Sequence, residues 1–139
     1  MPVVIREQLL NAILTAVGGE YGIPPPEDER DVPVTIVQDG VDEVATSFDT
    51  HNATMPLAIA RAEAAANTNR DTMRAHAHEM LGAIVAAMHA DETFGGLARG
   101  VDYTSGGIAI GAGALVFAEA TFRVRYSHAR GALATAAPT

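Results

Sequence analysis

The sequence contains no cysteine and no lysine among its 139 residues. Without cysteine, disulfide bonds and thiolate metal sites are excluded, and no redox compartment is implied. Without lysine, the phosphate-binding motif GxxxxGK[ST] is excluded. No run of about 18 apolar residues occurs, so no helix is expected to span a membrane. Residues 1–19 are not expected to be a signal peptide, because Arg6 and Glu7 interrupt their apolar stretch.

Acidic residues outnumber basic ones, and the excess lies in one stretch. The chain has 17 acids and nine arginines, for a net charge of −8. Residues 27–49 hold eight acids and one arginine, a net −7, whereas residues 50–139 hold seven of each. An acidic chain without a basic block is poorly suited to gripping nucleic acid, because that affinity comes mostly from cations on phosphates. The simplest interpretation of 27–49 is a solvated acidic loop with exposed strand edges.

Two segments place apolar residues at helical spacing. Residues 4–17 have one broad apolar face, and Gly18 and Gly19 follow as a natural helix stop. A longer helix is expected over 70–90, with Asn69 or Asp71 as its cap. Its apolar positions, which we expect to fill the core, are Met73, Ala77, Met80, Leu81, Ile84, Val85 and Met88.

The region between the helices begins with a proline-rich stretch. Residues 21–31 contain three consecutive prolines and five charged residues, which indicates an extended surface loop. Residues 32–37 then alternate as a strand does, and Asp39-Gly40 is a strong turn signal. A second short strand is expected within 41–48.

The next segment is ambiguous. A turn is expected at 49–53. In residues 54–66, Met55, Leu57 and Ile59 alternate as in a strand, but the many alanines that follow favour helix. We interpret 54–66 as a strand, because the turns on both sides frame it as a hairpin partner.

The last strand-like segment, about 114–126, has two different faces. One parity carries Ala118, Ala120, Phe122, Val124 and Tyr126. The other carries Glu119, Thr121, Arg123, Arg125 and Ser127. Because side chains alternate across a strand, we expect the apolar face to pack on helices and the polar face to meet solvent or a neighbouring molecule.

The order of elements predicts an α+β fold with one mostly antiparallel sheet and the two main helices packed on one face. Residues 99–110 supply another strand, which runs into a glycine-rich stretch. That stretch is either a hairpin loop or a flat strand surface that packs closely. A single domain is expected over 1–130, with a flexible tail at 131–139.

The sequence carries no specific catalytic or ligand-binding pattern. His76 and His78 point to different sides of the predicted helix, and Gly82 breaks the HExxH pattern that His78 begins. No serine lies in GxSxG. We therefore expect no metal, no cofactor and no enzymatic activity. A small hydrolase that uses the acids of 27–43 and a small ligand-binding module that uses the exposed sheet remain the alternatives.

The ordered pattern resembles the tail terminator and minor tail protein family of long-tailed bacteriophages, the lambda-like tail terminators with their relatives in prophages and gene transfer agents. Four stretches carry the resemblance in order and spacing over about 125 residues. They are IREQLLNAILTAV, VTIVQDGVDEV, ADETFGGLARGV and ALVFAEATFRVRYSHARG.

The resemblance implies a virion structural protein rather than an enzyme. Such proteins form a ring of identical copies, commonly a hexamer, at the end of the tail tube. The ring stops tube polymerisation and joins tail to head through connector proteins, and DNA passes through without specific binding. It implies assembly in the host cytoplasm and residence in the virion tail. Another head–tail connector or a tail-tube component is the alternative within the same class.

A ring of this kind suggests a use for the two charged regions. We expect the arginines of the last strand to pair with acids of the neighbouring subunit, since charge complementarity sets register and partner choice. A closed ring needs two different patches that meet, which suits a separate acidic region and arginine strand. The candidate interface residues are Arg123, Arg125, Asp39, Asp42 and Glu43. The alternative is that both arginines are merely solvated.

Overall fold

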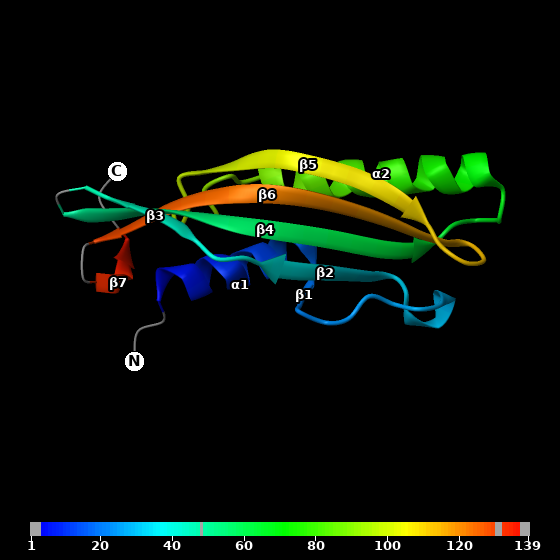
Figure 1. The fold of residues 1–139 in the computed structure, drawn as a ribbon, viewed down its shortest axis with the longest axis horizontal. Helices are drawn as coiled ribbons and strands as arrows, with labels where there is room; N and C mark the ends of the chain where they lie inside the picture. The colour runs from blue at the N-terminus through cyan, green and yellow to red at the C-terminus, as the bar shows by residue number, and fades with distance from the viewer. Residues whose placement is uncertain (1–3, 48, 130–131, 137–139) are drawn as a thin grey trace.

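The computed structural model describes residues 4–47, 49–129 and 132–136 and has an α+β fold (Figure 1). The helices are α1 (Ile5–Val17), α2 (Arg70–His89) and a short 3-10 helix, η1 (Glu29–Asp31). The strands are β1 (Glu20–Tyr21), β2 (Val34–Asp39), β3 (Glu43–Thr46), β4 (Thr50–Ala64), β5 (Gly100–Ile110), β6 (Leu115–Ala129) and β7 (Ala132–Ala136). Both α-helices lie behind one seven-stranded sheet in this view, which confirms the predicted fold class.

The sheet is built around one long antiparallel pair. Its order is β1-β2-β4-β6-β5, and β3 pairs with β4 while β7 pairs with β6. Strands β4 and β6 stay in register from Thr50 opposite Ala129 to Ala64 opposite Leu115. Only the β1–β2 pair is parallel within the part of the chain that the structure describes. In Figure 1 the β3–β4 hairpin extends past the ends of both helices.

Helix α1 forms and ends as the sequence predicts. Its apolar face is buried against the sheet, and the helix ends at Gly18 with φ 65°, a left-handed conformation that suits glycine. The N–H of Gly19 then donates to the carbonyl of Leu14 at 2.9 Å, which satisfies one of the last carbonyls of the helix. The buried residues of α1 are Ile5, Leu9, Leu10 and Ile13.

Helix α2 is capped by Asn69. The side-chain oxygen of Asn69 accepts hydrogen bonds from the N–H groups of Asp71 at 3.0 Å and Thr72 at 3.2 Å. The three methionines on α2 are buried, so their predicted role in the core is confirmed. The buried residues of α2 are Met73, Ala77, Met80, Ile84 and Met88. No helix in the described ranges is both long and apolar enough to cross a bilayer.

Strand β4 confirms the choice of strand for the alanine-rich segment and corrects its start. The strand begins at Thr50, so the turn predicted at 49–53 is too long. The cause is the β3 hairpin: Thr46 pairs with His51, and the N–H of Ser47 donates to the carbonyl of Thr50 at 2.8 Å. Burial between β2 and β6 overrides the helix propensity of alanine, because alternate side chains reach the core.

Strand β6 has the two faces that the sequence predicts, with one exception. The five residues of the apolar parity are each at most 5% exposed. On the other parity Arg123 and Arg125 are exposed, but Ser127 is buried and its hydroxyl donates to the side-chain oxygen of Asn52 at 2.7 Å. The neighbouring strands β4 and β3 extend beside Ser127, which the sequence of β6 alone does not reveal.

Other segments differ from expectation in detail. The tail expected from residue 131 contains β7 at 132–136, because the backbone continues to pair with β6; residues 131 and 137–139 lie outside the described residues. In the loop expected over 21–31, Tyr21 belongs to β1, which pairs with β2, and η1 forms at the far end. The glycine-rich stretch combines both expected forms. Gly106 lies in β5, where a Cβ would collide with the Tyr103 hydroxyl, and Gly113 turns the hairpin at φ 61°.

Candidate functional site

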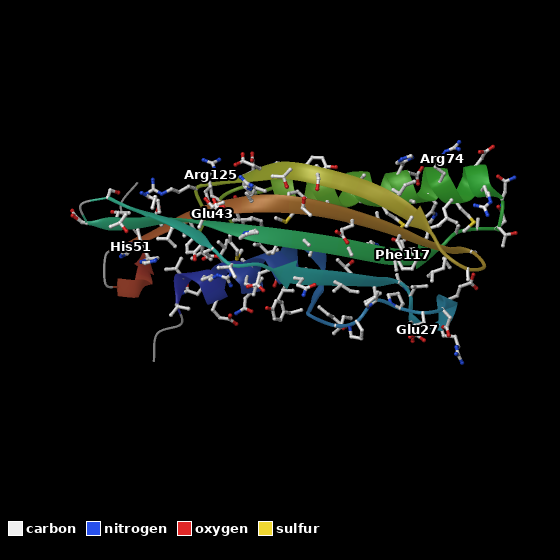
Figure 2. All side chains as sticks on the ribbon, in the orientation of Figure 1. Glu27, Glu43, His51, Arg74, Phe117 and Arg125 are labelled. Atoms are coloured by element: carbon white, nitrogen blue, oxygen red, sulfur yellow. The ribbon has the colours of Figure 1, made fainter. Side chains whose placement is uncertain are left out.

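One face of the sheet carries no α-helix within the described part of the chain, and we call it the open face. Figure 2 shows its side chains on the viewer's side of β2, β4 and β6. Small apolar residues occupy its middle, and charged residues follow along β6. The open-face residues of these three strands are Val34, Ile36, Gln38, Thr54, Pro56, Ala58, Ala60, Ala62, Phe117, Glu119, Thr121, Arg123 and Arg125. This surface is the candidate functional site.

Arg123 borders a hollow of about 420 Å³ on the open face. Pro56 and Ala58 lie opposite Arg123 and Thr121, and they form an apolar floor beside these polar groups. Gln38 contributes from β2. Among the described residues, Arg123 has no hydrogen bond or ion pair, so its guanidinium is available to a group from outside the chain. Its placement on the exposed face confirms the expected orientation, while its pairing with a neighbour stays a prediction.

Arg125 differs from Arg123 because its own chain provides a partner. The Nε of Arg125 lies 3.2 Å from an oxygen of Asp102, and both side chains are at least half exposed. The guanidinium lies over Gly100, where a Cβ would collide with it. An exposed pair of this kind contributes little to stability. Arg125 can therefore exchange Asp102 for another carboxylate at small cost.

Glu43 lies on the same row of the sheet as Arg125. Glu43 is opposite Thr54 on β4, and Thr54 is opposite Arg125 on β6. A second hollow of about 420 Å³ separates them, and Figure 2 shows both side chains at this end of the sheet. Glu43 is exposed and has no hydrogen bond or ion pair to another described residue. It remains a candidate for contact with a neighbouring subunit.

Asp39 and Asp42 are already bound within their own chain, around Arg6 of α1. The guanidinium of Arg6 donates to Asp42 from Nε at 3.1 Å and from Nη2 at 3.0 Å, and it forms a short ion pair with Asp39. Nη2 also donates to the carbonyl of Gly40 at 2.8 Å. The side chains of Asp39 and Asp42 are only 12% and 14% exposed. The sequence suggests both acids as interface residues but does not reveal Arg6 as their partner.

Two tyrosines complete this cluster, which we call the Arg6 cluster. The hydroxyl of Tyr21 donates to Asp39, and the hydroxyl of Tyr126 donates to Asp42. Burial raises the pKa of Tyr126, and the hydrogen bond to Asp42 raises it further. Burial lowers the pKa of Arg6, but its hydrogen bonds and ion pairs with the two acids outweigh this and raise it overall. The cluster ties α1, β1 and β6 to the turn after β2.

Asp39→Asn tests the ionic part of the Arg6 cluster. Burial raises the pKa of Asp39, but hydrogen bonds from Tyr21 and Arg6 outweigh burial and bring it below the ordinary value of about 3.9. A lowered folded-state pKa stabilises the fold fully above about pH 4, and this contribution is lost as the pH falls through the folded value. We expect Asp39→Asn to be less stable at pH 7, with the two stabilities converging below about pH 4. Urea unfolding measured across this range checks the expectation.

Glu79→Gln is the matched control for this measurement. Glu79 is an exposed carboxylate on α2 with no hydrogen bond or ion pair to another described residue. Its replacement should leave the urea midpoint unchanged across the same pH range. A constant difference between Asp39→Asn and the unaltered protein down to pH 2.5 would contradict the ionic role of Asp39.

A second polar cluster joins β4 to α2 and β2. Arg61 pairs with Glu63 and donates to the hydroxyl of Thr35 at 2.7 Å, while the Nε2 of His76 lies 2.9 Å from Glu63. Burial raises the pKa of Glu63, but the hydrogen bonds from Arg61 and His76 lower it below its usual range. All four polar side chains are satisfied within the chain. This pattern is typical of a structural network rather than of a site poised for turnover.

The histidines show one pairing that the sequence did not indicate. His51 and His128 lie opposite each other on β4 and β6, with ring centroids 5.2 Å apart. The Nδ1 of His51 is 2.9 Å from the hydroxyl of Thr46. Within 4–47, 49–129 and 132–136, no three side chains of the types His, Asp and Glu are placed to hold a metal ion.

The chain was compared with protein family models, curated proteins and solved structures. No protein family model matches the sequence, and no curated protein matches it. Among solved structures, the chain is similar to one described as the virion of a native gene transfer agent particle. The alignment covers 88% of this chain and 90% of that chain, with 18% identity and a TM-score of 0.38. At this TM-score the likeness carries no argument about fold or function.

Proposed function

We propose that the chain is a structural protein of a phage-like tail, which assembles into a ring of identical copies at the end of the tail tube. The ring stops tube growth and presents the surface that joins tail to head. The chain would work without cofactor or turnover. Its partners would be further copies of itself, the tail tube protein and the head–tail connector.

The open face is the observation that carries this proposal. A sheet that the described residues cover on one side only, with an arginine that none of them pairs over an apolar floor, offers a surface to another molecule rather than to solvent alone. The chain also carries an acidic excess at 27–49, and the acids at 27–31 lie outside the hollows that Arg123 and Arg125 border. Two patches of opposite charge on one chain favour head-to-tail contacts between copies, which close into rings. The resemblance to tail terminators supports placing that ring at the end of the tail tube.

The hollow beside Arg123 does not favour catalysis. Asp39 and Arg123 are the titratable residues among those that line it, and the Asp39 carboxylate already binds Arg6 and Tyr21. No histidine, cysteine or lysine lines it. A general acid or base needs a free group that can exchange a proton with the substrate, but Asp39 is already bound and the guanidinium of Arg123 stays protonated.

A tube-growth experiment tests the function. Tail tube protein from the same source would be polymerised with and without the purified chain, and tube lengths would be measured by electron microscopy. We expect tubes to shorten as the molar ratio of the chain rises, with extra density at one tube end. A chain that instead becomes incorporated along the whole tube would identify a tube component. Tubes of unchanged length with bare ends would contradict the terminator role.

A further inference from the structure

Two surface features are left unused by the intramolecular contacts, and they match each other. One is the hollow at Arg123. The other is the exposed proline segment at 23–27, which ends in Glu27. We propose that segment 23–27 of one copy docks in the Arg123 hollow of the next copy, with the Glu27 carboxylate on the Arg123 guanidinium. This inference rests on the proposed ring and names its contact.

The hollow suits an apolar segment that ends in a carboxylate. Its floor is formed by Pro56 and Ala58, which expose only ring and methyl carbons to an incoming group. Thr104 and Thr121 border the floor, and their hydroxyls are already hydrogen-bonded to each other at 2.8 Å, so Arg123 is the polar group left for the occupant. Arg123 provides a planar guanidinium that binds a carboxylate through two hydrogen bonds. A purely apolar occupant would leave Arg123 unpaired, and a purely polar one would leave the floor uncovered.

The conformation of the proline segment is restricted before any contact forms. Proline fixes φ and donates no backbone hydrogen bond, so Pro24-Pro25-Pro26 is an extended ridge that loses little entropy on docking. The ridge is anchored at both ends. The N–H of Gly22 donates to the carbonyl of Val37 at 3.0 Å, and the N–H of Ala114 donates to Glu29 at 2.6 Å.

Glu27 is the acid of this segment that is free to face outward. Asp28 pairs with Arg30 at 2.7 Å, and Glu29 is held by the N–H of Ala114. Glu27 is exposed and has no hydrogen bond or ion pair to another described residue. Asp31 is exposed as well, but it is the last residue of η1 and lies five positions beyond Pro26. Glu27 therefore has both the freedom and the position to reach Arg123.

The two surfaces lie on different parts of the molecule. The hollow is bordered by β2, β4, β5 and β6, whereas Figure 1 places the loop that carries segment 23–27 outside the β2 edge of the sheet. A contact between two different patches is heterologous, and it generates a ring when the rotation between copies closes. The Arg6 cluster keeps Asp39 and Asp42 out of this contact, because both carboxylates are bound in their own chain.

A charge exchange tests the pairing. Arg123→Glu alone and Glu27→Arg alone should each weaken self-association at least tenfold, because each places like charges in the contact. The double variant carrying both changes should return to within threefold of the unaltered protein. Arg70→Glu is the matched control, since Arg70 is an exposed arginine with no ion pair to the described residues and lies at the start of α2. Failure of the double variant to recover would overturn the pairing.

Crosslinking gives a second readout. Because the sequence has no cysteine, the introduced thiols are the only ones that can react. Pro25→Cys and Gln38→Cys variants would be mixed in equal amounts and treated with a short bis-maleimide. We expect a covalent dimer whose peptides join positions 25 and 38. Glu79→Cys mixed with Gln38→Cys should give none, because Glu79 lies on α2, on the covered side of the sheet.

These experiments distinguish a failure of the proposed contact between segment 23–27 and Arg123 from a failure of the proposed ring. If the unaltered protein assembles or caps tubes but neither charge exchange nor crosslinking supports the 27–123 contact, the docking is wrong and the ring stands. If Glu43→Arg, rather than Glu27→Arg, is rescued by Arg123→Glu, the occupant is β3 and the proposal is overturned. If the unaltered protein neither self-associates nor caps tubes, the proposed function fails together with the contact.

Discussion

Arg6→Ala is expected to lower the free energy of unfolding by roughly 2–3 kcal/mol at neutral pH. The change leaves Asp39 and Asp42 without their cation. This is costly because both carboxylates are mostly buried and lie close together at the end of β2 and the turn after it. The loss is smaller than for a fully buried ion pair, because the Arg6 side chain is 30% exposed. Urea or thermal unfolding at pH 7 measures the effect.

Two further variants make the Arg6 result specific. Arg30→Ala removes an arginine whose side chain is 89% exposed, and its unfolding midpoint should not move. Arg6→Lys should recover only part of the lost stability, because an ammonium cannot reproduce the planar contacts to both acids and to the carbonyl of Gly40. Equal midpoints for Arg6→Ala and the unaltered protein would show that the Arg6 cluster does not hold α1 to the sheet.

Reversing both arginines of the open face is expected to weaken self-association more than any single surface change. Arg123→Glu and Arg125→Glu together replace two cations by two anions on a surface proposed to meet acids. We expect the association constant to fall at least a hundredfold, which corresponds to about 2.7 kcal/mol. Sedimentation velocity over a concentration series gives the constant.

The fold should survive this double reversal. Arg123 has no hydrogen bond or ion pair to another described residue, and Arg125 has only the exposed pair with Asp102. Circular dichroism and the unfolding midpoint should therefore match those of the unaltered protein. Unchanged assembly in a folded variant would remove the open face from the account of the ring.

The spacing of apolar residues along the sequence is the basis for most of the correctly predicted fold. Apolar residues at helical spacing define α1 and α2, and alternation defines both faces of β6, because each pattern is local and each buried face needs a partner. The alternation at Met55, Leu57 and Ile59 also outweighs the alanines that follow, since β4 is central and packing decides there. The strand at 132–136 was missed because small residues carry no alternation of their own.

The candidate site was predicted only in part, because pairing between distant residues is not a local property. The sequence places Arg123 and Arg125 on one exposed face of β6, and the structure confirms this. It does not reveal that Asp39 and Asp42 bind Arg6, which lies 33 and 36 positions away along the chain. The available signal was the lone arginine within residues 1–26, close to a polar start of an otherwise apolar helix.

The native mass of the purified protein tests the central claim most directly. Mass would be determined at low and at moderate salt, over a concentration series, by light scattering coupled to size exclusion. The account predicts a discrete multimer near six copies that loosens as salt rises, because the contact between copies depends on charge. A monomer at every concentration and salt, which also fails to bind the ends of tail tubes, would contradict it.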